Sequence, residues 1–286
     1  MPRSIFITYV CAPGGILHVF TDFFPVVPVP GRDNSIFMIV LLLSMPAPII
    51  GRRFGVGLTP QLAAGNAKGI RVLGISGSSR QEPGQSKSER LLLRALERCT
   101  TLGCETTFIR LKDLKIYECE GNYSENPDHC TYPCQSTMKY EDDQMDTVYS
   151  AVLDTDVLFL ATPIRWNNHS ALVQKFVERM NCIENQYSWF GNRMIKNKVV
   201  GLIIIGHVDG MQHVAGNLLN FFAWLGFHIP EASIASWVGE NDEDTTKDWE
   251  QIEKNKYTQE DLVEMVNSSL QLAYTLKQGC EEVKGA

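Results

Sequence analysis

The sequence predicts an α/β domain in which helices cover both faces of a five-stranded parallel sheet. From Ile70 onward, short runs rich in Val, Ile and Leu alternate with longer stretches whose apolar residues recur at helical spacing. Three of these runs are apolar at nearly every position, as in strands that are buried on both faces. Five strands with intervening helices over about 170 residues are typical of a doubly wound domain.

The predicted elements follow one another in a regular order. The strands occupy residues 71–76, 106–111, 156–161, 198–205 and 233–238. Three apolar helical stripes follow the first, third and fourth strands: Leu92, Ala95, Leu96 and Cys99; Leu172, Phe176 and Met180; and Leu218, Phe221, Phe222 and Leu225. After Val238 the chain is polar and acidic, and it then resumes as an amphipathic helix for which Thr258 is the expected N-cap.

The first 69 residues have a different composition from the rest of the chain. They hold eight of the 13 prolines and eight of the 22 glycines, without a sustained periodic pattern. We therefore divide the chain into an irregular, potentially disordered extension (1–69), a core domain (70–240) and an acidic linker with a C-terminal helix (241–286). The uncharged stretch Asn34–Ile50 is 17 residues long and contains two prolines, so it is short for a membrane span. A membrane anchor or an atypical export signal is the less favoured alternative.

Composition excludes several classes of function. The net charge is −7, and no basic stripe is visible, so a nucleic-acid partner is not expected. Eight scattered cysteines in 286 residues are too sparse for a disulfide framework, which favours a reducing compartment and hence the cytoplasm.

The loop after the first strand has the composition of a phosphate site. It reads GSSRQEPGQSKS from Gly77 to Ser88 and runs directly into a helix. Hydroxyl groups, a guanidinium and the positive end of a helix together suit a terminal phosphate. The alternative is a serine-rich turn with an ordinary N-cap. Since neither GxxxxGK[ST] nor GxGxxG occurs, a nucleoside triphosphatase and a Rossmann dinucleotide site are disfavoured, and a mononucleotide remains.

Two further loops lie where ligands of parallel sheets are expected, at the carboxyl ends of the strands. The third-strand loop reads ATPIRWNNHS, and its Trp166 either covers one face of a planar heterocycle or packs in the core. The fourth-strand loop reads GHVDGMQ, in which Gly206 and Gly210 allow close approach of a ligand. His207 either contacts a ring edge or donates a proton, or it only satisfies a hydrogen bond in the loop.

Two of the three loops and one of the predicted helices resemble motifs of a known protein family. Residues 70 to about 240 resemble the NADPH-dependent FMN reductases, flavodoxin-like proteins related to multimeric flavodoxins and iron-sulfur flavoproteins. GSSR followed by SKS, the segment ATPIRW and the helix KFVERM (Lys175–Met180) match motifs of that group. The resemblance implies a 2-1-3-4-5 strand order, a bound FMN and a homodimer or homotetramer that completes the flavin pocket. The cofactor-binding residues it implies are Ser76, Ser78, Ser79, Arg80, Ser86, Lys87, Ser88, Thr162, Pro163, Ile164, Arg165, Trp166, Asn167, Gly206, His207 and Gly210. Residues 1–69 match nothing in that group.

The cysteines after the second strand depart from the iron-sulfur relatives, which carry a compact run of four. Here Cys119, Cys130 and Cys134 are separated by ten and then three residues, and a fourth local thiolate is lacking. They are weak candidates for a metal or cluster site, with His129 or Cys104 as a conceivable fourth ligand. The favoured expectation is no metal and a reduced loop.

The expected function is therefore that of an FMN-dependent oxidoreductase. NADPH or NADH would reduce the flavin, and the electrons would pass to a small acceptor such as a quinone or a flavin. No protein nucleophile or paired-carboxylate constellation is visible, so no catalytic residue is assigned. The alternatives are a flavodoxin-type electron carrier, an iron-sulfur flavoprotein that uses the three cysteines, and a flavodoxin-like binding module without a cofactor.

Overall fold

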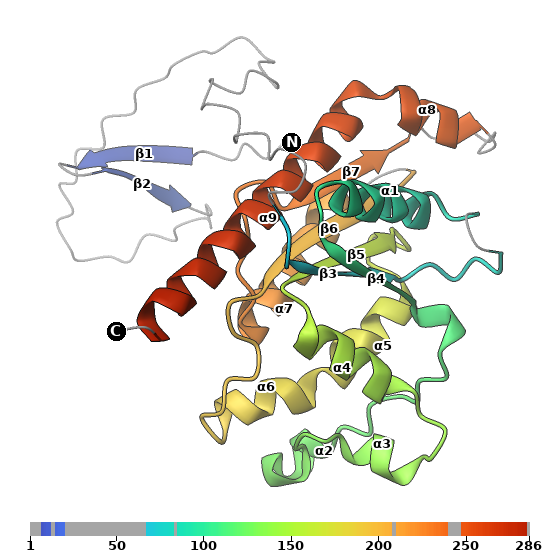
Figure 1. Ribbon diagram of the computed structural model, residues 1–286, viewed down its shortest axis with the longest axis vertical. Helices are drawn as coiled ribbons and strands as arrows, with labels where there is room; N and C mark the ends of the chain where they lie inside the picture. Colours follow the sequence, from blue (N-terminus) through green and yellow to red (C-terminus); the bar gives the residue numbers. More distant parts are fainter. Residues whose placement is uncertain are drawn as a thin grey trace, which may run out of the picture. The chain divides into compact units, whose positions relative to one another are not determined.

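The computed structural model describes residues 7–12, 15–20, 67–82, 85–207, 210–239 and 247–284 (Figure 1). The chain divides into two compact units, Met1–Phe54 and Gly55–Ala286. In the first unit, strand β1 (Ile7–Ala12) pairs antiparallel with β2 (Gly15–Phe20), within the segment for which the sequence predicts an irregular extension. The stretch 34–50 lies outside the described residues. Within the described part of the chain, no helix is long and apolar enough to cross a membrane.

The second unit is built on five parallel strands. They are β3 (Arg71–Ser76), β4 (Glu105–Arg110), β5 (Val157–Pro163), β6 (Val199–Gly206) and β7 (Ile234–Val238). Their order across the sheet is β4-β3-β5-β6-β7, which is 2-1-3-4-5 when these five are counted alone. Each strand begins and ends within two residues of its predicted range. The doubly wound sheet and its strand order are confirmed.

Helices cover both faces of this sheet (Figure 1). One face carries α1 (Lys87–Thr101), α8 (Asp248–Lys254) and α9 (Lys256–Lys284). The other carries α4 (Met145–Asp154), α5 (Ala171–Arg179), α6 (Asn181–Ser188) and α7 (Met211–Leu225). The connection from β4 to α4 contains the short elements η1 (Leu111–Asp113), α2 (Asn122–Glu125), η2 (Pro127–His129) and α3 (Gln135–Lys139).

Two apolar cores flank the sheet, because successive side chains of a strand point to opposite faces. In β5, Phe159 belongs to the core beneath α1 and α9, whereas Leu158 and Leu160 belong to the core on the other face. All three side chains are completely buried. Burial on both sides explains why the strands are apolar at nearly every position.

The C-terminal helix begins earlier than the sequence predicts. Thr258, the expected N-cap, lies inside α9, and its N–H donates to the side-chain oxygen of Asn255 at 3.0 Å. This is the bond that a capping side chain makes three residues into a helix. The hydroxyl of Thr258 instead donates to the carbonyl of Ser236 at 3.1 Å. The prediction of Thr258 as N-cap is wrong, because Asn255, an equally suitable capping residue, separates α8 from α9.

A buried ion pair fastens the long connection between β4 and α4 to α5. Arg179 Nη1 donates to Asp143 Oδ2 at 2.6 Å, and both side chains are completely buried. The same nitrogen donates to the carbonyl of Tyr117 at 2.8 Å, and Lys175 Nζ donates to the carbonyl of Ile116 at 2.9 Å. The two cations of the helix KFVERM thus hold the backbone that follows β4.

Replacing Asp143 by Ala should lower the free energy of unfolding by about 3–5 kcal/mol, because Arg179 would remain buried without its partner charge. Replacing the neighbouring Asp142 by Ala is the matched control: its side chain is 58% exposed and contacts Lys115 at the surface, so stability should hardly change. Urea unfolding measures both. Equal losses in the two variants would contradict the assigned role of the buried pair.

Candidate functional site

The loops after β3, β5 and β6 meet at the carboxyl edge of the sheet, and the loop between β3 and α1 projects beyond that edge (Figure 1). Gly77 joins the first two loops. Its N–H donates to the carbonyl of Ala161 at 2.8 Å, and its carbonyl accepts from the hydroxyl of Ser170 at 2.7 Å. A Cβ atom on Gly77 would lie 2.3 Å from a methyl carbon of Val173, so only glycine allows this approach.

The serine-rich loop gathers hydroxyl groups at the start of α1. Ser86 is the N-cap, and its hydroxyl accepts from the N–H of Glu89 at 3.4 Å and lies 3.0 Å from the hydroxyl of Ser88. Ser78 is buried, and its hydroxyl accepts from the N–H of Arg80 at 3.2 Å. Ser79 and Arg80 themselves are exposed. The first N–H groups of a helix lack helical partners, so this end of α1 adds donors and a positive dipole.

A buried charge network supports this loop from below. Glu89 Oε2 accepts from the hydroxyl of Ser76 and from Arg110 Nε, each at 2.9 Å. Arg110 Nη2 then donates to the carbonyl of Arg80 at 3.0 Å. Burial lowers the pKa of Arg110, but the hydrogen bonds and charges of Glu89 and Asp113 together outweigh burial, so that the pKa is raised. The hydroxyl of Ser76 is therefore hydrogen-bonded to Glu89 beneath the loop.

The third-strand loop is a tight turn that holds Trp166 in solvent. Arg165 and Asn168 exchange two backbone hydrogen bonds, of 2.7 and 2.9 Å. The two residues between them, Trp166 (φ 48°) and Asn167 (φ 62°), adopt the left-handed conformation of a type I′ turn. Trp166 is fully exposed, so the alternative of a core-packing tryptophan is wrong. A large apolar side chain in a strained, exposed position indicates a functional constraint.

The remaining residues of this loop connect it to its neighbours. Thr162 is buried and accepts from the N–H of Ser170 at 3.1 Å. Pro163 and Ile164 are half-buried, and the N–H of Ile164 donates to the carbonyl of Ile205 at 2.8 Å. A Cβ atom on Gly206 would lie 2.5 Å from Ile164, which shows how closely the loops after β5 and β6 pack.

Gly210, at the other end of the fourth-strand loop, also lies very close to the third-strand loop. Its φ is +99°, and a Cβ atom there would lie 2.2 Å from the side-chain oxygen of Asn167. Both features require glycine. The turn that carries Trp166 is therefore held between the loops after β3 and β6.

Asp248, at the start of α8, joins the site from a distant part of the chain. Its side chain is only 3% exposed, and its Oδ2 lies 2.5 Å from His207 Nε2. The same oxygen contacts Lys87 Nζ. His207 therefore does form the hydrogen bond that the sequence suggests, although with α8 and not within its own loop. The charge of Lys87 is balanced by Asp248 in this arrangement.

The sequence missed four contributors to this site, namely Glu89, Arg110, Ser170 and Asp248. Glu89 had a readable signal, because Ser86 and Glu89 have the spacing of a capping box. Ser170 directly precedes a helical stripe, as an N-cap should. Asp248 had no signal, since nothing in its local sequence points to Lys87 or His207.

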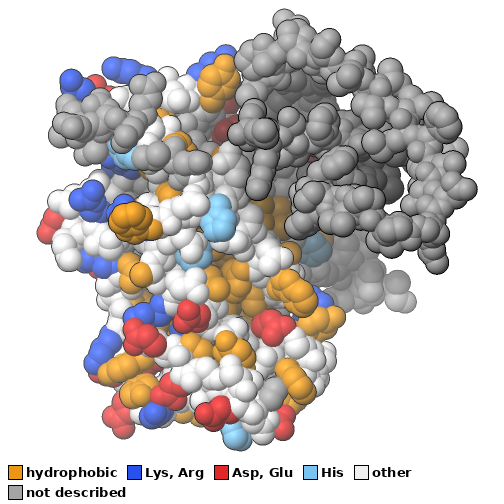
Figure 2. All heavy atoms as spheres, turned by 180° about the vertical axis from the view of Figure 1, so that it is seen from behind, with side chains coloured by type: hydrophobic (Ala, Val, Ile, Leu, Met, Phe, Trp, Pro, Cys, Tyr) orange, Lys and Arg blue, Asp and Glu red, His pale blue; other side chains and the backbone are white. Residues whose placement is uncertain are grey.

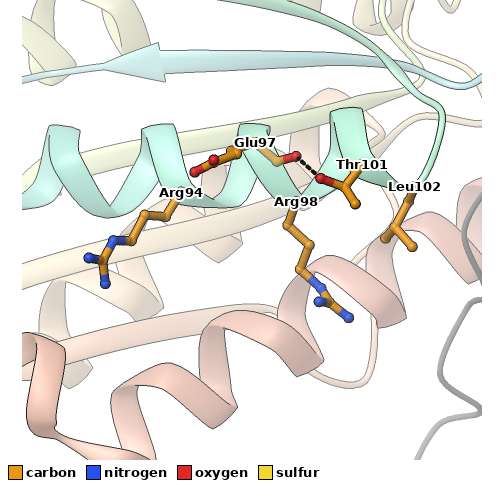
Figure 3. A pocket seen from close by; sticks show the side chains of 5 residues that line it. All are labelled: Arg94, Glu97, Arg98, Thr101 and Leu102. Atoms are coloured by element: carbon orange, nitrogen blue, oxygen red, sulfur yellow. Dashed lines mark hydrogen bonds between the residues drawn. The ribbon is translucent and has the colours of Figure 1, made fainter.

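A hollow of about 250 Å³ lies elsewhere, along α1, lined by Arg94, Glu97, Arg98, Thr101 and Leu102 (Figure 3). The first four lie in the C-terminal half of α1 and Leu102 is its C-cap, toward the sheet edge opposite the serine-rich loop. The Arg98 Nη2 already donates to Asn267 of α9 at 3.0 Å. On the face drawn in Figure 2, acidic and basic side chains are interspersed among exposed hydrophobic ones. The loops after β3, β5 and β6 therefore remain the candidate functional site.

The cysteine-containing loop does not gather its thiols into a set of metal ligands. In the described part of the chain, no group of three or more His, Cys, Asp or Glu side chains is arranged to hold an ion. Cys119, Cys130 and Cys134 are free and half-buried. An iron-sulfur flavoprotein therefore has no support from these three thiols.

Two curated proteins are similar in sequence to this chain. The chain is 26% identical over 170 residues to 8-demethyl-8-aminoriboflavin-5′-phosphate synthase of Streptomyces davaonensis, covering 59% of this chain and 64% of that protein. It is 26% identical over 172 residues to the divalent metal cation transporter MntH of Mycobacterium bovis, covering 60% of this chain and 24% of that protein. The chain thus spans less than two thirds of both relatives.

Among solved structures, the fold is similar to that of RosB with bound 8-demethyl-8-formylriboflavin-5′-phosphate, with a TM-score of 0.63 and 23% identity over 73% of this chain and 81% of that one. The model of the family described as NADPH-dependent FMN reductase matches residues 70–241, which contain all three loops of the site. Because this match covers more than half of the chain, the protein belongs to the NADPH-dependent FMN reductase family.

Proposed function

We propose that the protein is an FMN-dependent oxidoreductase that takes electrons from NADPH or NADH and passes them to a small acceptor such as a quinone or a flavin. Family membership supports the flavin cofactor and the oxidoreductase class. The observation that carries the proposal is a strained, fully exposed Trp166 on a loop that is hydrogen-bonded to Gly77, where the serine-rich loop begins.

The residues at the serine-rich loop fit the phosphate of FMN. Ser78, Ser86 and Ser88 supply hydroxyl donors, and the start of α1 supplies backbone N–H groups. Within the described residues, Arg80 makes no side-chain ion pair and is exposed, so its guanidinium can turn toward an anion. Lys87 is the weaker candidate for a phosphate contact because its charge is already paired with that of Asp248.

The loops after β5 and β6 fit the ring system. Trp166 offers an uncovered aromatic face, and Arg165 and Asn167 are exposed beside it. A planar ring stacked on an indole gains both apolar burial and a favourable ring–ring interaction. Gly206 and Gly210 keep the neighbouring loop close to this turn, so its backbone can border the same ligand.

When bound, FMN supplies the chemistry of hydride acceptance and electron delivery. The protein's part is to hold phosphate and ring in fixed positions and to leave one ring face accessible to both substrates in turn. His207 is held by Asp248, and burial lowers the pKa of His169, so His169 stays neutral near neutral pH. We assign no side chain as a catalytic acid or base. A cytoplasmic homodimer or homotetramer that completes the flavin pocket belongs to the same proposal.

In a second candidate function, the flavin is the substrate and not the cofactor. The relative from Streptomyces davaonensis is named as a synthase of a modified riboflavin phosphate, and its similarity extends over 170 residues of this chain. The same site would then bind riboflavin 5′-phosphate and release it chemically altered. A pure electron carrier is disfavoured because Arg80 and the Ser86–Ser88 hydroxyls match the reductase pattern.

Anaerobic addition of NADPH to the FMN-loaded protein should bleach the visible absorption of the flavin. An acceptor such as a quinone should then restore it without changing the flavin's mass. Absorption spectroscopy and mass spectrometry of the extracted flavin measure both. A flavin that stays yellow with NADPH and, in a parallel sample, with NADH would contradict the reductase and indicate a carrier, whereas an altered flavin mass would establish the second candidate.

Replacing Ser78 and Arg80 together by Ala should weaken FMN binding by about 2–4 kcal/mol, since two partly charge-assisted hydrogen bonds to the phosphate are lost. Riboflavin, which lacks the phosphate, should bind both proteins equally. Arg94→Ala removes the same charge from the far part of α1 and should leave FMN affinity intact. Calorimetric titration decides: unchanged FMN affinity in the double variant would remove the phosphate assignment.

Replacing Trp166 by Ala should weaken FMN binding by about 0.5–1.5 kcal/mol, the value of one ring–ring interaction. Stability should not fall, because Trp166 is fully exposed. Trp224→Ala is the control: it is also exposed but lies at the end of α7, toward the opposite edge of the sheet. Fluorescence titration of FMN measures the difference. Identical affinities for the two variants would show that Trp166 does not cover the ring.

A further inference from the structure

Two thiols, a phenol and a guanidinium form a cluster that the proposed reaction does not use. Arg179 Nη2 donates to Cys134 Sγ at 3.6 Å. The carbonyl of Arg179 accepts from the Tyr149 hydroxyl at 2.5 Å and from the Cys182 thiol at 3.6 Å. Arg179, Tyr149 and Cys182 are buried, whereas Cys134 is half-buried and thus within reach of a small molecule.

The surroundings of Cys134 favour its thiolate. The neighbouring Cys182 thiol lowers the pKa of Cys134 to about 5; burial opposes this shift, and the charge of Arg179 and the Tyr149 hydroxyl support it. The neighbouring Cys134 sulfur and burial raise the pKa of Cys182. At neutral pH Cys134 is therefore the thiolate, and Cys182 keeps its proton, which it donates to the carbonyl of Arg179. A guanidinium beside a low-pKa thiol is typical of reactive cysteines.

The guanidinium of Arg179 is held beside the Cys134 sulfur, because its Nη1 also donates to Asp143 at 2.6 Å and to the carbonyl of Tyr117 at 2.8 Å. Cys130 provides the contrast. It is half-buried in the same connection, but burial, followed by the charge of Cys119, raises its pKa to about 11. Two cysteines four residues apart thus have similar access and opposite electrostatics.

We propose that Cys134 is a peroxide-reactive thiolate and that Cys182 is its resolving thiol. The Cys134 sulfur attacks one oxygen of hydrogen peroxide, the O–O bond breaks, and the other oxygen leaves as hydroxide and takes up a proton to become water. The sulfur is oxidised by two electrons to a sulfenic acid. The Cys182 sulfur then attacks it, an S–S bond forms, the S–O bond breaks, and the oxygen leaves as water with the proton of Cys182. The sum is two thiols and one peroxide converted to one disulfide and two waters.

Mass-spectrometric peptide mapping tests this proposal on the full chain. The protein is treated with one equivalent of hydrogen peroxide at neutral pH, then denatured in acid and alkylated before digestion. A Cys134–Cys182 cross-linked peptide is expected, with Cys130 recovered in alkylated form. In the untreated native protein, iodoacetamide should label Cys134 at least about tenfold faster than Cys130.

Three variants separate the roles of the sulfurs. Cys182→Ser keeps a donor for the carbonyl of Arg179 but removes the resolving sulfur, so it should trap the sulfenic acid, detected as a dimedone adduct on Cys134. Cys134→Ser should leave Cys182 reduced after the same treatment, and Cys130→Ser should leave the cross-link unchanged. Equal oxidation of Cys130 and Cys134, or a Cys134 that keeps its free thiol, would overturn the proposal. Overoxidised Cys134 without a cross-link to Cys182 would overturn the resolving role.

Discussion

The contact between Ser170 and Gly77 is the constraint on which the site depends. One hydroxyl caps α5 through the N–H of Val173 at 3.3 Å and donates to the carbonyl of Gly77 at 2.7 Å. The start of a helix that follows β5 is thereby fixed to the loop that follows β3. Because the two strands are neighbours in the sheet, this bond sets the distance between the phosphate-type loop and the turn that carries Trp166. A side chain larger than hydrogen at Gly77 would separate them.

The geometry of the site follows from strain that the surrounding structure holds in place. A tryptophan in the left-handed region costs about 1–3 kcal/mol, and its exposed indole gains nothing from burial in this state. The turn persists because its two backbone hydrogen bonds close it and because Asn167 packs against Gly210. A ligand that covers the indole would recover the apolar burial that the protein itself does not provide.

Local patterns predicted most of the fold. Apolar runs located all five strands, since strands buried on both faces leave little ambiguity. The helix α4 was missed although its buried residues, Met145, Val148, Tyr149 and Val152, follow the spacing of an amphipathic helix. Likewise, the three loops could be recognised from composition, but Asp248 lies 161 residues from Lys87, and only the folded chain brings the two together. Such long-range ion pairs have no periodicity or spacing from which they can be read.

We propose that FMN binds at the carboxyl edge of the sheet, between the serine-rich loop and the turn at Trp166. Hydrogen–deuterium exchange of the full chain, with and without FMN, tests this most directly because it locates the ligand without any substitution. Bound FMN should slow exchange in residues 77–88 and 163–168 and leave residues 94–102, which include the lining of the hollow on α1, unchanged. Protection confined to 94–102, or to the cysteine-containing connection 117–134, would contradict it.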